Sequence, residues 1–180
     1  MHHPAPNFHI VTGGPGSGKS TLIDALERKG FTRSVEAGRG IIRDQMAVGW
    51  TALPWRDPAA YAELMLCWEM RSHHIARAHA GPVIFDRGVP DIVGYLRLTG
   101  LPVPAHVDKA ARTFNYNRRV FLAPPWPEIF EQDAERKQDF EEAERTCRAM
   151  VETYASYGYD LVELPRVSME ERVRFVMDRL

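Results

Sequence analysis

Cysteine is scarce in this chain, which has only Cys67 and Cys147 among 180 residues. That number excludes a disulfide-stabilised scaffold and a cysteine-rich zinc site. Each cysteine lies among apolar neighbours in a stretch of helical periodicity, which predicts two buried free thiols rather than a disulfide or a metal pair. The adjacent histidines His73 and His74 lack the spacing of a helical ligand pair, and we expect them on a partly exposed helix face. The expected compartment is a reducing cytoplasm.

Long apolar runs are also missing. None reaches the length of about 20 residues that a membrane-spanning helix needs, so we expect no membrane span. Residues 1–7 lack the apolar segment of a signal peptide. Because no internal repeat, low-complexity segment or linker interrupts the chain, the sequence predicts one domain over residues 1–180.

Neither sign of charge is in excess. The net charge is −1, and lysine occurs only at positions 19, 29, 109 and 137. Proteins whose main task is to bind nucleic-acid backbone carry a strongly basic surface, so we expect no dedicated nucleic-acid binding. The hydrophobic content of 44% and the charged content of 26% are typical of a globular domain that buries a core.

Glycine, in contrast, is concentrated near the start of the chain. Residues 13–20 read Gly-Gly-Pro-Gly-Ser-Gly-Lys-Ser, which fits the phosphate-loop pattern of Gly, four residues and Gly-Lys-Ser. An apolar strand is expected at 8–12 and a helix at 20–29. This context separates a phosphate loop from the alternative, a glycine-rich turn that occurs by chance. Glycines let the backbone wrap around a phosphate chain, and the helix N-terminus adds its positive end.

The loop supplies the candidate nucleotide-binding residues. Lys19 can reach the β- and γ-phosphates, and Ser20 offers a hydroxyl to Mg²⁺. The expected set is Gly14, Pro15, Gly16, Ser17, Gly18, Lys19, Ser20 and Thr21.

Strand and helix patterns alternate along the whole chain. We expect five strands, at 8–12, 31–36, 83–85, 119–122 and 159–164. We expect helices at 20–29, around 41–46, at 59–80, 90–98, 103–114, 140–157 and 169–180. Strands separated by helices pair in parallel through crossovers, which predicts an α/β sheet with helices on both faces. Such a sheet binds ligands beyond the carboxyl ends of its strands.

Asp86 and Arg87 directly follow the apolar strand at 83–85. A phosphate-loop enzyme places a carboxylate there to hold Mg²⁺, directly or through water, so we expect Asp86 in that role. The alternative is that Asp86 caps the next helix. Arg87 can contact the phosphoryl acceptor or simply pair with a carboxylate.

Glu36 and Arg39 follow the strand at 31–36. A carboxylate at this place can accept the proton of an attacking hydroxyl, and the arginine can orient the acceptor or a phosphate. The alternative is a salt bridge or a cap where the loop meets the next helix.

The segment before the helix at 140 is polar and contains Asp133, Arg136 and Lys137. We expect a lid at about 125–140 that closes over the nucleotide, with Arg136 as a catalytic cation on the transferring phosphoryl group. The alternative is a solvated charged face. Trp126, at the start of this region, is expected to pack in the core, and the alternative is that it packs under the lid or beside a ligand.

Together these motifs resemble a family of small ATPases described by an AAA domain. The resemblance rests on residues 13–20, on Glu36 with Arg39, and on the stretches 85–91, 121–126 and 130–136. The family is similar to the kinase half of bacterial ribosylnicotinamide kinases, and more distantly to thymidylate and deoxynucleoside kinases. The resemblance implies a three-layer P-loop NTPase fold of nucleoside- and nucleotide-kinase type, with a five-stranded parallel sheet and a lid. It also implies Mg²⁺ and ATP as cofactors, with GTP as an alternative nucleotide.

Two functions follow from these expectations. The first is a kinase that transfers the γ-phosphoryl group of ATP to a hydroxyl of a nucleoside-like acceptor, with the protein as a monomer or homodimer. By the resemblance, Lys19, Ser20 and Asp86 match the nucleotide and metal positions, and Glu36, Arg39 and Arg87 face the acceptor. The alternative is a slow ATPase or GTPase that acts as a nucleotide-gated switch. A dedicated GTPase would usually carry an Asn-Lys-x-Asp motif, which this chain lacks.

Overall fold

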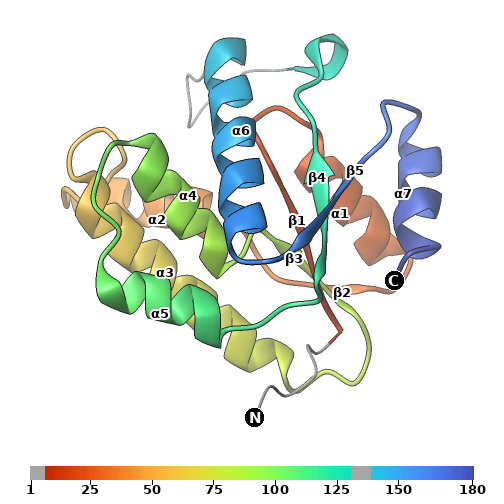
Figure 1. The fold of residues 1–180 in the computed structure, drawn as a ribbon, viewed down its shortest axis with the longest axis horizontal. Helices are drawn as coiled ribbons and strands as arrows, with labels where there is room; N and C mark the ends of the chain where they lie inside the picture. Colours follow the sequence, from red (N-terminus) through yellow and green to blue (C-terminus); the bar gives the residue numbers. More distant parts are fainter. Residues whose placement is uncertain (1–6, 131–138) are drawn as a thin grey trace.

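Five parallel strands form the centre of the protein (Figure 1). The computed structural model describes residues 7–130 and 139–180. The strand order is β2-β3-β1-β4-β5, and every neighbouring pair is parallel. The strands are β1 Phe8–Gly13, β2 Thr32–Arg33, β3 Val83–Asp86, β4 Arg119–Ala123 and β5 Asp160–Glu163. The five-stranded parallel sheet expected from the sequence is confirmed.

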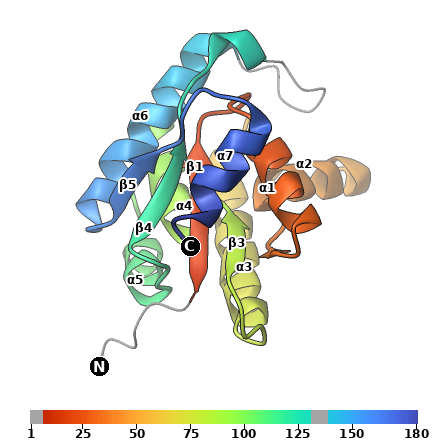
Figure 2. The ribbon, with the colours of Figure 1, turned by 90° about the vertical axis from the view of Figure 1, so that its right-hand side faces the viewer.

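Seven α-helices and one short 3₁₀ helix connect the strands in the described residues. They are α1 Lys19–Arg28, α2 Ala37–Val48, α3 Pro58–Ala76, α4 Val89–Leu98, α5 Ala105–Thr113, η1 Pro127–Ile129, α6 Phe140–Ser156 and α7 Met169–Met177. Figures 1 and 2 show α1 and α7 on one face of the sheet and α3, α4, α5 and α6 on the other. The protein therefore has the three layers that the resemblance implied.

The central strands are apolar on both sides because helices cover both faces of the sheet. On β1, Val11 packs toward α1 and α7, whereas its neighbour Ile10 packs toward α3 and α4. Ile84 and Phe85 alternate in the same way on β3. The edge strands β2 and β5 have no fully buried residue, which agrees with their position.

Side-chain caps fix where several helices begin. Asp57 accepts a hydrogen bond from the amide of Ala60 at 2.9 Å, and Pro58 occupies the first turn of α3. Asp139 caps α6 by accepting from the amide of Glu142 at 2.8 Å. No helix in the described part of the chain has both the length and the apolar character that a membrane crossing needs.

Helix α3 differs from the expectation in which residues it buries. Cys67 and Ile75 are exposed, so the prediction of a buried thiol is wrong for Cys67, whereas Cys147 is buried as expected. His73 is buried, contrary to the expected exposed face, because its ring packs edge-on against Phe8 and its Nε2 lies 2.9 Å from a backbone carbonyl oxygen. The apolar spacing of the sequence predicts a buried stripe through Tyr61, Leu64, Met65, Trp68 and Ile75. The buried residues of α3 are instead Tyr61, Ala62, Leu66, Glu69, His73 and Ala76, so the buried face is rotated relative to that stripe.

The second strand is shorter than expected. β2 contains only Thr32–Arg33, and Glu36 is the N-cap residue of α2 rather than the end of a strand. An edge strand with one neighbour gains few ladder hydrogen bonds, so the chain leaves the sheet early. Glu36 nevertheless remains close to the carboxyl ends of β1 and β3.

Candidate active site

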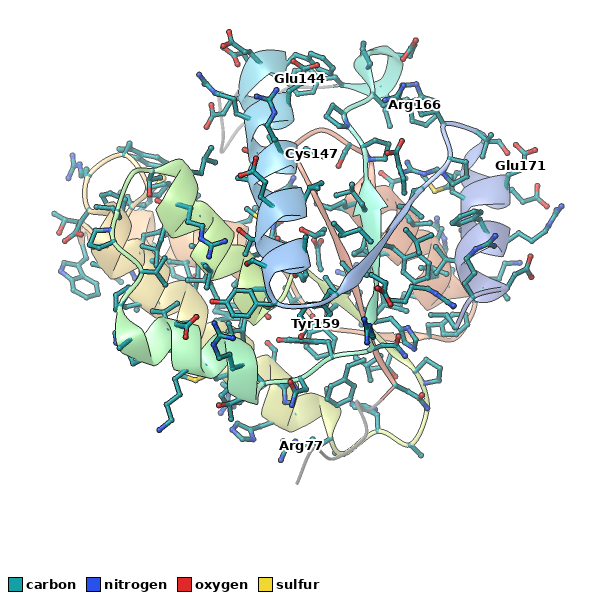
Figure 3. The ribbon with its side chains drawn as sticks, viewed as in Figure 1. Arg77, Glu144, Cys147, Tyr159, Arg166 and Glu171 are labelled. Atoms are coloured by element: carbon teal, nitrogen blue, oxygen red, sulfur yellow. The ribbon has the colours of Figure 1, made fainter. Side chains whose placement is uncertain are left out.

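The phosphate loop joins β1 to α1, and it packs against α6. Gly18 is the N-cap of α1 with a φ of 76°, a conformation that favours glycine. A Cβ added at Gly14 would overlap the carbonyl oxygen of Ala143 on α6. Only glycine therefore allows the loop to approach that helix as closely as it does. Cys147 follows one turn later on the same helix (Figure 3).

Lys19 folds back onto this loop. Its Nζ donates to the carbonyl oxygen of Gly14 at 2.5 Å and to Ser17 Oγ at 3.2 Å. Burial lowers the pKa of Lys19 to about 7, and the nearby Arg87 acts in the same direction. A phosphate chain would supply the anionic partner that this ammonium group lacks, since the loop offers it only neutral acceptors.

Asp86 ends β3 beside Lys19. Its side chain is buried, and Oδ1 has no hydrogen-bond partner among the described residues. Burial and the carboxylate of Glu36 raise the pKa of Asp86 to about 6, against the opposing effect of Lys19. The N-cap of α4 is Gly88, so the alternative role of Asp86 as a helix cap is wrong.

The residues at the loop fit a magnesium ion. Mg²⁺ takes one or two protein oxygens and completes its shell with phosphate oxygens and water. Asp86 Oδ1 is a buried oxygen without a partner, and Ser20 presents its hydroxyl in the first turn of α1. The described residues contain no cluster of three or more His, Cys, Asp or Glu side chains that could hold a metal without such help.

Glu36 lies between two arginines. Its carboxylate oxygens are 3.2 Å from Arg39 Nε and 3.8 Å from Arg87 Nε. The salt bridge considered as the alternative for Glu36 and Arg39 is therefore present. Glu36 also lines the cavity described below, so the pairing leaves its side chain facing that space. A role as proton acceptor stays a prediction.

Asp91 is a buried acceptor on the first turn of α4, and the sequence predicts no role for it. It accepts hydrogen bonds from Thr12 Oγ1 at 2.6 Å, from Arg87 Nη1 at 3.0 Å, from the Gly88 amide at 3.0 Å and from the hydroxyl of Tyr154. Arg87 has a φ of 73°, which costs an L-residue about 1 kcal/mol or more. The network holds Arg87 in that conformation. Arg87 precedes the N-cap of α4, so no helical pattern in the sequence signals its pairing with Asp91.

A cavity of about 600 Å³ opens next to the phosphate loop. Pro15 of the loop lines it, together with Glu36 and Arg87. Helices α3 and α4 contribute most of the apolar lining, and Glu69 of α3 contributes a carboxyl. Helix α6 adds Met150 and the polar side chains of Glu142, Arg145 and Thr146. The volume lies within the range of about 300–1,000 Å³ that is usual for small-molecule sites.

Arg172 on α7 is a second residue that sequence reasoning missed. It is buried, and both terminal nitrogens lie 3.4–3.5 Å from the carbonyl oxygen of Ser17 in the phosphate loop. Its guanidinium also lies 5.6 Å from the ring centre of Trp126. Trp126 is only half-buried, so the expected core packing is wrong, and the ring instead forms part of this cluster beside the loop.

The expected lid is described only in part. Its first residues form η1, and the rings of Phe130 and Phe140 meet edge-on at 5.4 Å. Arg136, with Asp133 and Lys137, lies outside the described residues. The role of Arg136 stays a prediction. The other site residues expected from the sequence gather around the loop and the cavity.

Comparisons with known proteins agree with this geometry. The AAA domain family matches residues 8–172. No curated protein matched the chain in a sequence comparison. Deoxyadenosine kinase from M. mycoides with bound dATP superposes with a TM-score of 0.68 at 13% identity, covering 96% of this chain and 97% of that one. The NadR protein in complex with NR gives a TM-score of 0.66 at 18% identity, covering 97% of this chain and 49% of that one.

At such identities the two solved structures show the fold alone. The family match, in contrast, extends from β1 through the phosphate loop and the cavity into α7. The chain belongs to the AAA domain family, and its fold is similar to that of deoxyadenosine kinase.

Proposed function

We propose that the protein is a kinase that transfers the γ-phosphoryl group of ATP to a hydroxyl of a nucleoside-like acceptor bound in the cavity. The observation that carries the proposal is the cavity of about 600 Å³, which shares Pro15 with the phosphate loop. A nucleotide-gated switch needs only the loop, whereas a kinase needs a second site of substrate size beside it. The two similar structures, a deoxyadenosine kinase and a protein in complex with NR, support this class of acceptor.

The residues around the phosphate loop have separate roles in phosphoryl transfer. The loop amides and Lys19 hold the β- and γ-phosphates, and Asp86 and Ser20 would hold Mg²⁺. The ion neutralises charge on the phosphate oxygens when it is bound. The acceptor hydroxyl attacks the γ-phosphorus, the bond from that phosphorus to the bridging oxygen breaks, and ADP leaves. The hydroxyl proton passes to a Glu36 carboxylate oxygen.

The remaining proposed roles are orientation of the acceptor and closure of the lid. Arg87 is fixed by Asp91 at 3.0 Å and faces the cavity, so it orients the acceptor together with Arg39. Arg136 brings a positive charge to the phosphoryl group when the lid closes. ATP is the nucleotide of this proposal, and GTP is its alternative. A cytoplasmic location and a monomeric or homodimeric state belong to the same proposal.

ATP turnover with and without a nucleoside panel tests the function. The panel includes deoxyadenosine and ribosylnicotinamide, and the assay measures ADP and the phosphorylated acceptor separately. We expect ADP release to depend on one class of acceptor and to match its phosphorylation in amount. Lys19→Ala should abolish turnover and leave the circular dichroism spectrum unchanged, because Lys19 offsets phosphate charge. Slow ATP hydrolysis at the same rate with and without each acceptor would instead favour the nucleotide-gated switch.

A further inference from the structure

The cavity contains a buried carboxyl that the proposed reaction does not use. Glu69, near the middle of α3, is 2% exposed, and its side chain lines the cavity. Oε2 of Glu69 has no hydrogen-bond partner among the described residues. Buried polar atoms in proteins are nearly always paired, so an orphaned oxygen at a cavity wall calls for a partner from outside the chain.

The neighbouring charged groups are already engaged with one another. Asp91 accepts hydrogen bonds from Thr12 and Arg87, among others, and Arg87 also lies 3.8 Å from Glu36. Arg87 is thus shared between two other carboxylates. Arg145 of α6, the other arginine that lines the cavity, lies 3.6 Å from Glu141. Glu69 forms no ion pair with a cation among the described residues.

The charge around Glu69 sets its protonation state. Burial raises the pKa of Glu69 well above its usual value, and the carboxylates of Asp91, Asp86 and Glu36 raise it further, against the opposing effect of Arg87. These groups come from α4, β3 and the start of α2, the elements that surround α3 at the cavity. These effects favour the uncharged form of the carboxyl, which offers both an O–H donor and a carbonyl acceptor.

The phenol of Tyr116 is the other titratable group that feels this carboxyl. Burial raises the pKa of Tyr116, and Glu69 raises it further. The Tyr116 hydroxyl accepts a hydrogen bond from the Val89 amide at 3.2 Å. It thus stays neutral and adds no charge beside Glu69.

The shape of the cavity indicates the ligand that would meet this group. Tyr61 and Tyr95 pack edge-on with ring centres 5.5 Å apart, and Met65 and Ile92 continue the apolar wall. Such walls favour a flat ring. An uncharged carboxyl pairs best with a neighbouring donor and acceptor, the pattern of a carboxamide or of the amide or amidine edge of a nucleobase.

We propose that Glu69 determines acceptor specificity by forming a paired hydrogen bond with the amide- or amidine-type edge of a flat heterocycle. The acceptor then spans the cavity, with its ring against the tyrosine wall and Glu69, and with its hydroxyl toward Glu36 at the phosphate loop. The position of the hydroxyl rests on the proposed kinase function. The ring contact does not depend on it.

Binding measured without ATP tests the contact. Isothermal titration calorimetry would compare deoxyadenosine with purine deoxyriboside, which lacks the 6-amino group, and ribosylnicotinamide with ribosyl nicotinic acid, in which a carboxylate replaces the carboxamide. The wild-type protein should bind the member with the amide or amidine edge about tenfold or more tightly in at least one pair, which is the usual effect of one lost hydrogen bond in a buried site.

Three variants separate recognition from folding. Glu69→Gln keeps a neutral donor and acceptor, so it should preserve the discrimination within about threefold, and Glu69→Leu should abolish it. Glu63→Gln, which alters an exposed carboxylate on the same helix, is the matched control and should behave as wild type. Thermal unfolding of each variant shows that the fold is retained.

The outcomes are distinct. Unchanged discrimination in Glu69→Leu, or no binding of any probe to the wild-type protein, would overturn the assignment. Loss of binding in Glu69→Gln as severe as in Glu69→Leu would also overturn it, because the carboxyl would then act as an anion that holds a cation. Discriminating binding without phosphoryl transfer would reject the kinase function and leave the role of Glu69 intact.

Discussion

Thr12 donates a hydrogen bond of 2.6 Å to Asp91, although 79 positions separate the two residues. This contact joins the strand that leads into the phosphate loop to the first turn of α4. The same carboxylate holds Arg87, so the positions of the nucleotide loop and of the acceptor-facing arginine depend on one side chain.

Asp91→Asn should therefore affect both stability and turnover. An asparagine cannot accept hydrogen bonds from four donors and leaves Arg87 without its closest anion. We expect a loss of about 2–3 kcal/mol in the free energy of unfolding, measured by urea denaturation. The KM for the acceptor should rise more than the Kd for ATP. Asp160→Asn changes an exposed carboxylate that pairs with Arg118 and serves as the control. Equal unfolding energies for the two variants would contradict the role of the network.

Glu36→Gln tests the proton acceptor. The amide keeps the shape of the side chain but cannot take a proton, so ATP affinity should persist while phosphoryl transfer falls by about 10²–10⁴. Arg39→Ala should raise the acceptor KM instead, if the arginine orients that molecule. Steady-state kinetics with separate ATP binding measurements distinguish the two effects. If both variants lose thermal stability and share one modest kinetic defect, the 3.2 Å pair is only a structural bridge.

Arg172→Met probes the nucleotide side of the loop. Methionine keeps most of the apolar stem and removes the guanidinium that contacts the Ser17 carbonyl and lies near Trp126. Because the loop loses this support, we expect the Kd for ATP to rise about tenfold, equivalent to 1.4 kcal/mol, with little change in acceptor binding. Arg174→Met lies two positions further on α7 and is exposed, so it should match the wild type. Titration with a fluorescent ATP analogue measures the Kd of both variants. An unchanged Kd in Arg172→Met would show that this contact does not support ATP binding.

His9 predicts how stability depends on pH. It is buried in β1, and burial together with Arg119 lowers its pKa to about 4. His9 therefore takes up a proton near pH 6.5 in the unfolded chain, but only near pH 4 in the folded protein. Stability from this residue is complete above pH 6.5 and is lost as the pH falls toward 4, by at most about 3 kcal/mol.

His9→Leu should flatten this part of the stability profile, measured by urea unfolding at several pH values. His106→Gln removes an exposed histidine that pairs with Glu63, and it should leave the decline in place. A decline of unchanged size in His9→Leu would assign the acid sensitivity to other groups.

The sheet and the loop could be predicted from sequence because their signals are local. The apolar runs at 8–12 and 83–85 are bounded by glycine or by polar residues, and the Gly-Lys-Ser pattern requires its strand and helix. The short β2 could not be predicted in the same way, because the length of an edge strand depends on neighbours that are distant in sequence.

The missed site residues are buried polar groups. Glu69 and His73 follow Leu66 at helical spacing, and all three are buried on α3. A glutamate in a helix ordinarily indicates a solvent-facing position. The apolar spacing therefore favours a buried stripe through Ile75 over the face that contains Glu69. Burial of Arg172 depends on contact with a loop 155 positions away, which no local pattern encodes.

The strand order also has a consequence for inheritance. After β1 the chain first builds the β2-β3 side of the sheet and only then the β4-β5 side. Most of the cavity wall, from Glu36 to Thr99, is therefore one continuous stretch of sequence, whereas the cluster of Trp126 and Arg172 beside the loop comes from the later half. Recombination between relatives at the two ends of that stretch would exchange most of the cavity wall in a single event, together with Glu36 and Asp86, and the phosphate loop itself would pass on unaltered.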